Sequence, residues 1–466
     1  MNLKSFLKEN FEFRLDAEYF LKANLEKLTK LSNVGYQKIS AFGYVTDGIH
    51  TAIDYSEDSN VNLFSATTPR ENFFDLTRQV FISEKAHREN PRTALKENDI
   101  IISTVGTIGN CAVVNKDVLP ANSDRHVGII RLENYDFLPR YISTFLLTKY
   151  GRFQTWREST GNVQLNLFLY RIRTLKIANL SKTFQFKIEN SVLLADSKRK
   201  NSQSLYTQAE TLLLETIGLK DFEPSKEPVN IKSFKDSFIA TGRLDAEYYQ
   251  KKYEEVVSHI KTQNHSPLKK LVEISKSLEP GSNHYSEDEG LPFYRVADFN
   301  KFGLGEPNKK LTNSFVQDNK EQIENLKPKK GTILFSKDGS VGTAYLLRND
   351  LPGITSSAIL HLQIKNKAEL IPEYLVLALN SKLVQMQAER DAGGSIILHW
   401  RKEEIEQVVV PIIDFKKQQE IAVLVEESFR LKTESEHLLE VAKQAVEIAI
   451  EQDEDRAMEY INENKA

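Results

Sequence analysis

The sequence predicts an α+β fold: two homologous mixed α/β domains in a pseudo-two-fold arrangement, joined by two long antiparallel α-helices that form a coiled-coil spacer. The first observation is an internal repeat, because residues 13–20 (FRLDAEYF) return as residues 242–249 (GRLDAEYY). The second is a nearly constant register, since the offset is 229 residues there and 233 residues where STVGTIG at Ser103 matches SKDGSVG at Ser336. The third is a long helical pattern that closes each half. Any function should therefore be present in two copies.

Each half opens with a short helical segment and continues through a stretch rich in strand and turn signals. Short runs of β-branched and aromatic residues flank a glycine turn at residues 100–103 and 112–114, and again at 332–336 and 344–347. A helical stretch follows, from Pro139 to about Trp156 and from Pro372 to about Arg390. Both stretches begin with a proline, which suits the first turn of a helix.

The closing segments are predicted as two long helices, at residues 184–218 and 416–452. Apolar residues recur there near helical spacing. At a rise of ~1.5 Å per residue, thirty residues make a helix about 45 Å long. A narrow apolar stripe on such a helix is normally buried against another helix. If a two-fold relates the halves, the two helices pack antiparallel and hold the globular parts at opposite ends.

The remaining boundaries follow from proline content and charge. The first domain, with its N-terminal helical segment, is predicted at residues 1–183, and the second at 234–415. A linker with two prolines lies at 219–233. The tail, at 453–466, is rich in Asp, Glu and Asn, so we expect it to be frayed or disordered.

Composition indicates a soluble globular protein without a membrane segment. The chain has 466 residues, of which 40% are hydrophobic and 27% charged. Its single cysteine, Cys111, excludes an internal disulfide and a cysteine-rich zinc cluster. No run approaches ~18 apolar residues, and no secretory signal opens the chain, so we expect a cytoplasmic location. The net charge is −3, with the acid concentrated at the C-terminus, so DNA would have to meet local basic patches.

No residue pattern supports a catalytic, metal or cofactor site. None of the nine histidines forms an H-x-x-x-H or H-E-x-x-H pair, and no G-x-S-x-G turn is present. The glycine turns lack the Walker lysine and the G-x-G-x-x-G spacing of nucleotide-binding loops. The N/D-P-P-Y/F tetrad of an amino-methyltransferase is also missing. We therefore expect a chain without catalysis of its own.

Two regions carry candidate DNA-contacting side chains. The first follows the YSED tetrapeptide that both halves share, and its basic residues are Arg70, Arg78, Arg88 and Arg92, and Arg295, Lys301, Lys309 and Lys310. The second comprises the glycine turn and the loop after the inner helix, with Thr104, Asn162, Gln164 and Asn166, and Lys337, Ser395, His399 and Arg401. The simpler alternatives are ordinary surface charges in the first region and a loop that only locks the scaffold in the second.

In their order and duplication these features resemble the specificity (S) subunit of Type I restriction-modification systems. The resemblance rests on R-L-D-A-E-Y-[YF] at the start of each half and S-x-x-G-[TS]-[IV]-G in mid-domain. A glycine-containing turn before Ile177 or Val410-Pro411 and the long closing helices complete it. The resemblance covers nearly the whole chain.

The resemblance implies that each half is a target recognition domain, which reads one part of a split double-stranded DNA sequence. The coiled coil would hold the domains a fixed distance apart, and ~45 Å corresponds to roughly 13 base pairs. The chain would be a non-catalytic adaptor that recruits two methyltransferase (M) subunits, which methylate adenine N6, and two restriction (R) subunits. S-adenosylmethionine, ATP and Mg would belong to these partners, and no cofactor to this chain.

Three alternatives stay open. The partner polypeptide could combine methyltransferase and nuclease, or the complex could be an orphan modification system without a nuclease. A different class is a protein-binding scaffold that makes no contact with DNA. The two RLDAEY segments are expected near the end of the other half's long helix, where a scaffold or methyltransferase-docking role would suit them.

Overall fold

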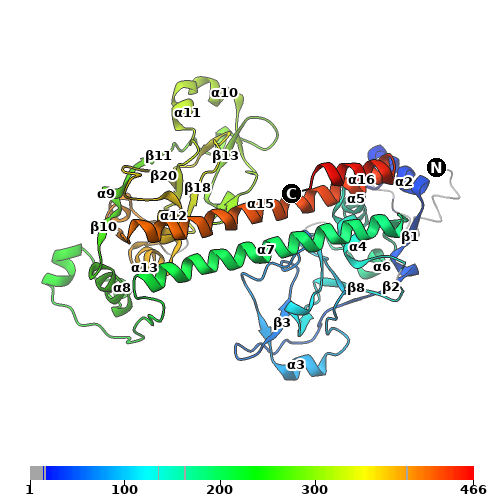
Figure 1. Cartoon of the computed structure of the whole chain (residues 1–466), viewed down its shortest axis with the longest axis horizontal. Helices are drawn as coiled ribbons and strands as arrows, with labels where there is room; N and C mark the ends of the chain where they lie inside the picture. Colours follow the sequence, from blue (N-terminus) through cyan, green and yellow to red (C-terminus); the bar gives the residue numbers. More distant parts are fainter. Residues whose placement is uncertain (1–13, 15–16, 135, 162–163, 395–396, 466) are drawn as a thin grey trace. The chain divides into compact units, whose positions relative to one another are not determined.

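The computed structural model describes residues 14, 17–134, 136–161, 164–394 and 397–465 (Figure 1). The chain divides into two compact units. Unit 1 comprises Met1–Lys200 and Leu431–Ala466, and unit 2 comprises Asn201–Arg430. Each unit therefore contains the globular part of one half together with a portion of both long helices.

Unit 1 contains nine of the named strands: β1 (Tyr36–Lys38), β2 (Gly43–Asp47), β3 (Val61–Phe64), β4 (Phe81–Ile82), β5 (Ile100–Ser103), β6 (Cys111–Val113), β7 (Ala121–Ser123), β8 (Val127–Leu132) and β9 (Lys176–Ala178). Its helices are η1 (Ala17–Phe20), α2 (Lys22–Val34), α3 (Glu84–Glu89), α4 (Pro139–Leu147), α5 (Lys149–Glu158), α6 (Leu169–Ile172) and α16 (Glu454–Glu463). The first part of α7 (Lys182–Thr216) and the last part of α15 (Phe415–Glu451) complete the unit.

Unit 2 contains the strands β10 (His265–Pro267), β11 (Val272–Lys276), β12 (Tyr285–Ser286), β13 (Leu291–Tyr294), β14 (Phe299–Asn300), β15 (Gly303–Leu304), β16 (Lys310–Leu311), β17 (Ile333–Ser336), β18 (Ala344–Leu346), β19 (Ile354–Thr355), β20 (Ile359–Ile364) and β21 (Val409–Pro411). Its helices are η4 (Lys235–Ile239), α8 (Lys251–Lys261), α9 (Leu268–Leu271), α10 (Asn313–Asp318), α11 (Lys320–Leu326), α12 (Pro372–Asn380), α13 (Lys382–Asp391) and α14 (Lys402–Ile405). The rest of α7 and α15 lies here.

The two units have the same main-sheet topology, which confirms the repeat. The main sheet of unit 1 has the order β2-β8-β5-β6, and that of unit 2 has the order β11-β20-β17-β18, with every pair antiparallel. A smaller sheet beside each contains a parallel pair, β3 with β7 or β13 with β19. The predicted strand, glycine turn, strand units are the β5–β6 and β17–β18 hairpins.

Each main sheet is buried on both faces, which explains its continuous apolar runs. Ile100 and Ile102 of β5 pack with the helices in the main core of unit 1. Ile101 points to the other face and packs with Phe64 and Phe74 from the smaller-sheet side. Side chains alternate between faces along a strand, so three consecutive isoleucines serve two cores.

The inner helical stretch, predicted as one segment, is two helices in each unit. Pro139 and Pro372 occupy the first turns of α4 and α12, as expected. The break falls at Thr148, whose hydroxyl accepts hydrogen bonds from the backbone amides of Tyr150 and Gly151 and so caps α5. In unit 2 the equivalent break falls at Ser381.

In unit 1, α7 and α15 pack against each other in antiparallel directions. Near the start of α7, the Ser181 amide donates to Glu454 Oε1 at 2.7 Å, just beyond α15. Farther along, Ser435 Oγ donates to Ala195 O at 2.7 Å, so partner numbers fall as α7 numbers rise. The buried positions alternate by three and four residues, as in a coiled coil: Ile188, Val192 and Ala195, and Ser435, Leu438, Ala442, Ala445 and Ala449.

In unit 2 the same spacing continues along both helices. The buried positions are Ser202, Tyr206, Ala209 and Leu213 on α7, and Ile421, Val425 and Ser428 on α15. Ser428 Oγ donates to Ser202 O at 2.7 Å. The α+β class, the repeated domain and the paired long helices are thus confirmed. The prediction placed the helices at 184–218 and 416–452, and they span Lys182–Thr216 and Phe415–Glu451.

The expectation of a frayed or disordered tail at 453–466 is wrong. Residues 454–463 form α16, which begins at Asp453, whose side chain accepts from the Arg456 amide. Ala457 and Ile461 are 0% and 3% exposed in the main core of unit 1. The acidic composition of the tail led to the prediction of disorder. The two buried side chains, four residues apart, lie on one face of the helix and pack it against the core. No described helix is long and apolar enough to cross a membrane.

Candidate nucleic-acid interface

In unit 2 the structure brings the glycine turn and the loop after the inner helix together at one edge of the main sheet. The Gly339 amide donates to Leu398 O at 2.8 Å, and the Trp400 amide donates to Lys337 O at 2.8 Å. The Lys337 amide also donates to Ala358 O at 2.9 Å, at the turn between β19 and β20. Three connections far apart in sequence therefore form one surface.

The polar side chains of this surface meet at Asp338. Lys337 Nζ lies 2.6 Å from Asp338 Oδ2, and His399 Nδ1 lies 2.9 Å from Asp338 Oδ1. The side chains of Lys337 and Asp338 are each 18% exposed, whereas that of His399 is 64% exposed. Arg401 follows at the start of α14 and pairs with Glu404, with 68% of its side chain exposed. The surface thus offers nitrogen donors to a ligand, while Asp338 restrains Lys337 and His399 and Glu404 restrains Arg401.

Unit 1 has the same arrangement with different side chains. A β-bridge joins Val105 in the glycine turn to Asn166 in the loop, and a second bridge joins Thr160 to Asn166. The Leu167 amide donates to Thr104 O at 2.9 Å. Gln164 is exposed and Asn166 half-buried, whereas Thr104 is only 7% exposed. Thr104 therefore builds the surface through its backbone, and Gln164 and Asn166 present donors and acceptors on it.

Sequence reasoning missed the third contributor in unit 1, the turn Asp124-Arg125-His126 between β7 and β8. The Thr104 amide donates to His126 O at 3.1 Å, which places this turn beside the glycine turn. Arg125 is exposed, and His126 Nδ1 lies 3.5 Å from Asp124 Oδ2. The corresponding turn of unit 2 holds Ser356, Ser357 and Ala358. The clue was the cluster of charges in SDRH between two apolar strands.

The four arginines predicted from the first region do not gather at one place. Arg70 pairs with Asp75 at 3.0 Å, Arg88 pairs with Glu84 within α3 at 3.3 Å, and Arg78 is exposed. Only Arg92 reaches the edge described above, through Asp47 at 3.1 Å and Gly48 O at 3.4 Å. Burial raises the pKa of Asp47, but hydrogen bonds from His50 and Arg92 outweigh it, so this carboxyl stays below its usual pKa.

The basic residues predicted from the first region of unit 2 also have structural partners. Lys301 pairs with Glu210 of α7 at 3.1 Å and lies over the ring of Tyr206, so it fastens the domain to the long helix. Lys309 pairs with Glu287, and Lys310 Nζ donates to Asp288 O at 2.7 Å. Arg295 lies 3.9 Å from Asp298. Asn162 and Ser395 lie outside the described residues.

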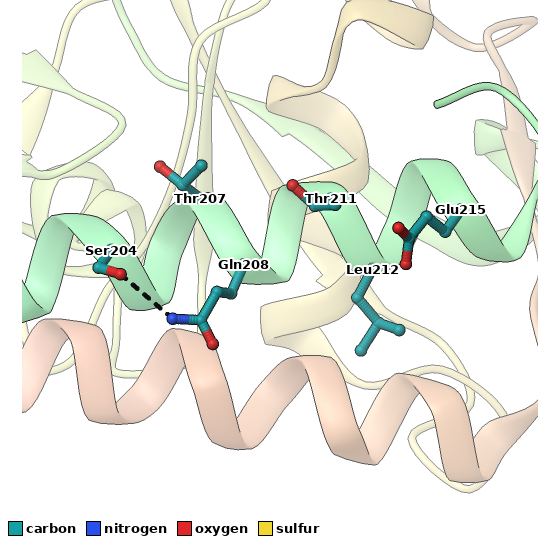
Figure 2. Close-up of a pocket in the computed structure, with 6 residues that line it drawn as sticks. All are labelled: Ser204, Thr207, Gln208, Thr211, Leu212 and Glu215. Carbon is teal, nitrogen blue, oxygen red and sulfur yellow. Dashed lines mark hydrogen bonds between the residues drawn. The ribbon is translucent and has the colours of Figure 1, made fainter. Parts of the chain in front are cut away.

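A shallow groove runs along α7 in unit 2. Figure 2 shows its six lining side chains, Ser204, Thr207, Gln208, Thr211, Leu212 and Glu215. Ser204 and Gln208 are joined by a hydrogen bond of 3.2 Å, and Glu215 pairs with Lys220. The groove is open, and its one carboxylate is the paired one of Glu215. Nowhere among the described residues do three or more His, Cys, Asp or Glu gather as a metal site.

Comparison with known proteins finds a family model that matches part of the second half of the chain. Residues 261–441 match the family described as the Type I restriction modification DNA specificity domain. This match agrees, over residues 261–441, with the resemblance that the sequence motifs indicated. The matched family is described by its role in DNA specificity, and the match extends over residues 261–441 of the 466. Among curated proteins, none matches the chain.

Solved structures of two such subunits are similar to the chain. The S subunit of a Type-I restriction-modification system from M. genitalium is 12% identical, with a TM-score of 0.41 over 92% of this chain and 95% of that chain. The HsdS subunit from Thermoanaerobacter tengcongensis is 12% identical, with a TM-score of 0.29 over 90% of this chain and 97% of that chain.

Proposed function

We propose that the whole chain reads a bipartite DNA sequence, with one half-site read by each half of the chain. The match of residues 261–441 to the Type I restriction modification DNA specificity domain supports the proposal. The observation that carries the proposal is the surface where the glycine turn meets the following loop, which both units possess. The scaffold of that surface is the same in both units, but its side chains differ. Two readers of one architecture with different side chains suit two different half-sites.

The distribution of donors supports a role in base reading. Unit 1 presents Arg125, Gln164 and Asn166, and unit 2 presents Lys337, His399 and Arg401. Arginine and lysine donate to guanine O6 and N7, and the amides of Asn and Gln pair with adenine. Thr104 would contribute through its backbone, and Asn162 and Ser395 stay candidates on the sequence alone. Of the basic residues of the first region, Arg92 would add a phosphate contact at the margin of this surface.

We further propose that the long helices set the gap between half-sites. A helix of 35 residues such as α7 is about 50 Å long. That length corresponds to roughly 15 base pairs at ~34 Å per turn of ten. The half-sites would then be separated by a stretch of DNA that the chain does not read.

The chemistry would come from partner subunits. Two methyltransferase subunits would bring S-adenosylmethionine to adenine N6, and two restriction subunits would bring ATP and Mg. An adenine inside a duplex must leave the base stack to be methylated. The chain and the methyltransferases would therefore enclose the duplex together.

The test is an exchange of residues 21–180 for the corresponding domain of another specificity subunit. Methylation is then mapped by sequencing the DNA of a host that carries the complex. The expected result is a new first half-site, with the second half-site and the gap unchanged. A change in both halves, or in neither, would refute the modular function.

A matched measurement separates the alternatives that differ in partner. Co-purification from the host shows whether methyltransferase and nuclease arrive as separate chains, as one fused chain, or without a nuclease. A gel shift on random duplex at low salt, with the methyltransferase present, tests the DNA-free scaffold. Binding that weakens steeply with salt supports DNA recognition. Binding that fails at every salt concentration supports the scaffold.

A further inference from the structure

Near the start of each half, an arginine of the RLDAEY motif contacts the end of the second inner helix of the same half, which is α5 in unit 1 and α13 in unit 2. In unit 1, Arg14 Nη1 donates to Arg157 O at 2.7 Å and to Ser159 O at 3.4 Å. These carbonyls belong to the last turn of α5 and the residue after it, where helical carbonyls lack backbone partners. Arg14 therefore caps the helix at the point where the chain enters the loop of the candidate interface.

Unit 2 repeats the contact with the second copy of the motif. Arg243 Nη1 donates to Asp391 O at 3.0 Å, and Asp391 is the last residue of α13. Arg243 is itself held by Asp245 of the same motif, with Nε at 2.8 Å from Oδ1. This hydrogen bond is the main reason why the pKa of Asp245 is lowered. The two contacts occupy the same place in two copies of the fold.

An aromatic ring and a second arginine complete each contact. In unit 1 the Arg157 guanidinium lies 3.7 Å from the centre of the Tyr19 ring, and that of Arg14 lies 4.8 Å from it. In unit 2, Arg243 and Arg390 lie 4.5 and 5.3 Å from the centre of the Tyr248 ring. A guanidinium stacked on a ring loses rotational freedom, so its hydrogen bonds have a defined direction.

Few residues separate this arginine contact from the surface where the glycine turn meets the loop after the inner helix, which we call the reading surface. In unit 2 the loop begins directly after Asp391 and closes with a bridge between Gly393 and His399. His399 is in turn bridged to Asp338 of the glycine turn. The direction in which the chain leaves α13 therefore sets where His399 and Asp338 lie. From the sequence we expected the RLDAEY segment near the end of the other half's long helix. In unit 2 the contact with the residue after the end of α7 comes instead from α8, the helix that follows the motif, because His259 Nε2 lies 3.0 Å from Ile217 O.

We propose that Arg14 and Arg243 are positioning residues for half-site recognition, each fixing the loop of its own half against the glycine turn. This inference rests on the proposed function of that surface and deepens it. The RLDAEY motif then acts inside each recognition domain, rather than as a docking site for the methyltransferase. Each arginine should affect only the half-site that its own unit reads.

The test uses the full chain in complex with its methyltransferase partner. Methylation rates are measured at both half-sites, on the cognate duplex and on duplexes with one base pair changed in either half. Arg243→Ala should lower discrimination at one half-site about tenfold, the effect of losing one base contact, and leave the other within about twofold. Arg243→Lys keeps the cation and should restore part of the discrimination. Arg14→Ala should give the mirror result at the other half-site.

The matched control is Arg348→Ala. The Arg348 guanidinium lies in unit 2, 3.9 Å from the centre of the ring of Phe429, a residue of α15. It should lower the thermal unfolding temperature of the complex without altering discrimination at either half-site. If Arg243→Ala acts like this control, or impairs both half-sites equally, the inference is wrong.

Loss of co-purification with the methyltransferase, with discrimination per assembled complex unchanged, would also overturn the inference, because the motif would then be a docking element. A failure of the proposed function looks different. In that case the wild-type complex itself would show no split target, whatever the arginine variants do.

Discussion

Asp338 limits the positive charge that unit 2 can offer to DNA. Its carboxylate lies 2.6 Å from Lys337 Nζ and 2.9 Å from His399 Nδ1, and its side chain is 18% exposed. Asp338→Asn keeps the size and most of the hydrogen-bonding geometry but removes the negative charge. We expect this variant to bind random duplex DNA more tightly than the wild type, because Lys337 is released to a phosphate.

The size of the effect follows from the release of counterions. Removing one carboxylate from the interface raises the number of phosphates that the chain neutralises by about one. Each such phosphate changes the slope of log K against log salt by about −0.9 on duplex DNA. Between ~1 M and ~0.1 M salt, the affinity of the variant should therefore gain about eightfold more than that of the wild type. The ratio of affinities for cognate and random DNA should fall in this variant, because its binding through phosphates alone is stronger.

The assay is fluorescence anisotropy of a labelled random duplex over a series of salt concentrations. The matched control is Asp350→Asn, which removes the same charge from the same unit. Asp350 pairs with Lys329 at 3.4 Å and accepts from the Lys330 amide, at the opposite end of the β17–β18 hairpin from the glycine turn. Salt screens charges beyond ~10 Å, so the control should keep the wild-type slope. An unchanged slope for Asp338→Asn, or weaker binding, would refute the reasoning.

Three further predictions concern stability. Each of the variants Tyr141→Phe and Tyr374→Phe should lower the free energy of unfolding, measured with denaturant, by about 1–2 kcal/mol. The reason is that each buried hydroxyl donates a hydrogen bond to a strand carbonyl, at 2.8 and 2.6 Å respectively. A loss in one unit only would contradict the equivalence of the two tyrosines. Ile461→Asp should expose residues 454–463 to hydrogen exchange, whereas Glu463→Ala should not. Burial lowers the pKa of His361 from 6.5 to about 4. Because the folded state disfavours protonation of His361, the free energy of unfolding of unit 2 is highest above pH 6.5 and falls by about 3 kcal/mol as the pH drops to 4. His361→Gln should remove this pH dependence.

The sequence alone predicted the architecture, because the strand, turn and helix patterns of the first half recur in the same order in the second half. The β-branched runs around the glycine turns predicted both central hairpins, and Pro139 and Pro372 marked the helix starts that the structure has. The long helices were visible because a stripe that recurs every three and four residues depends only on neighbours along the chain. The family resemblance followed from the same repeated motifs.

The composition of the reading surface came from long-range pairing, which no local pattern contains. Asp338 lies in a turn that follows β17 of the main sheet, and Arg125 lies in a turn between β7 of the smaller sheet and β8 of the main sheet, so both reach the surface through strand pairing. The basic residues of the first region looked like DNA contacts, yet Lys301 folds back onto Glu210 of α7. The acidic tail became a helix because unit 1 leaves an apolar site that Ala457 and Ile461 fill. A side chain's partners depend on which segments meet in space, and that choice belongs to the packing of the whole unit.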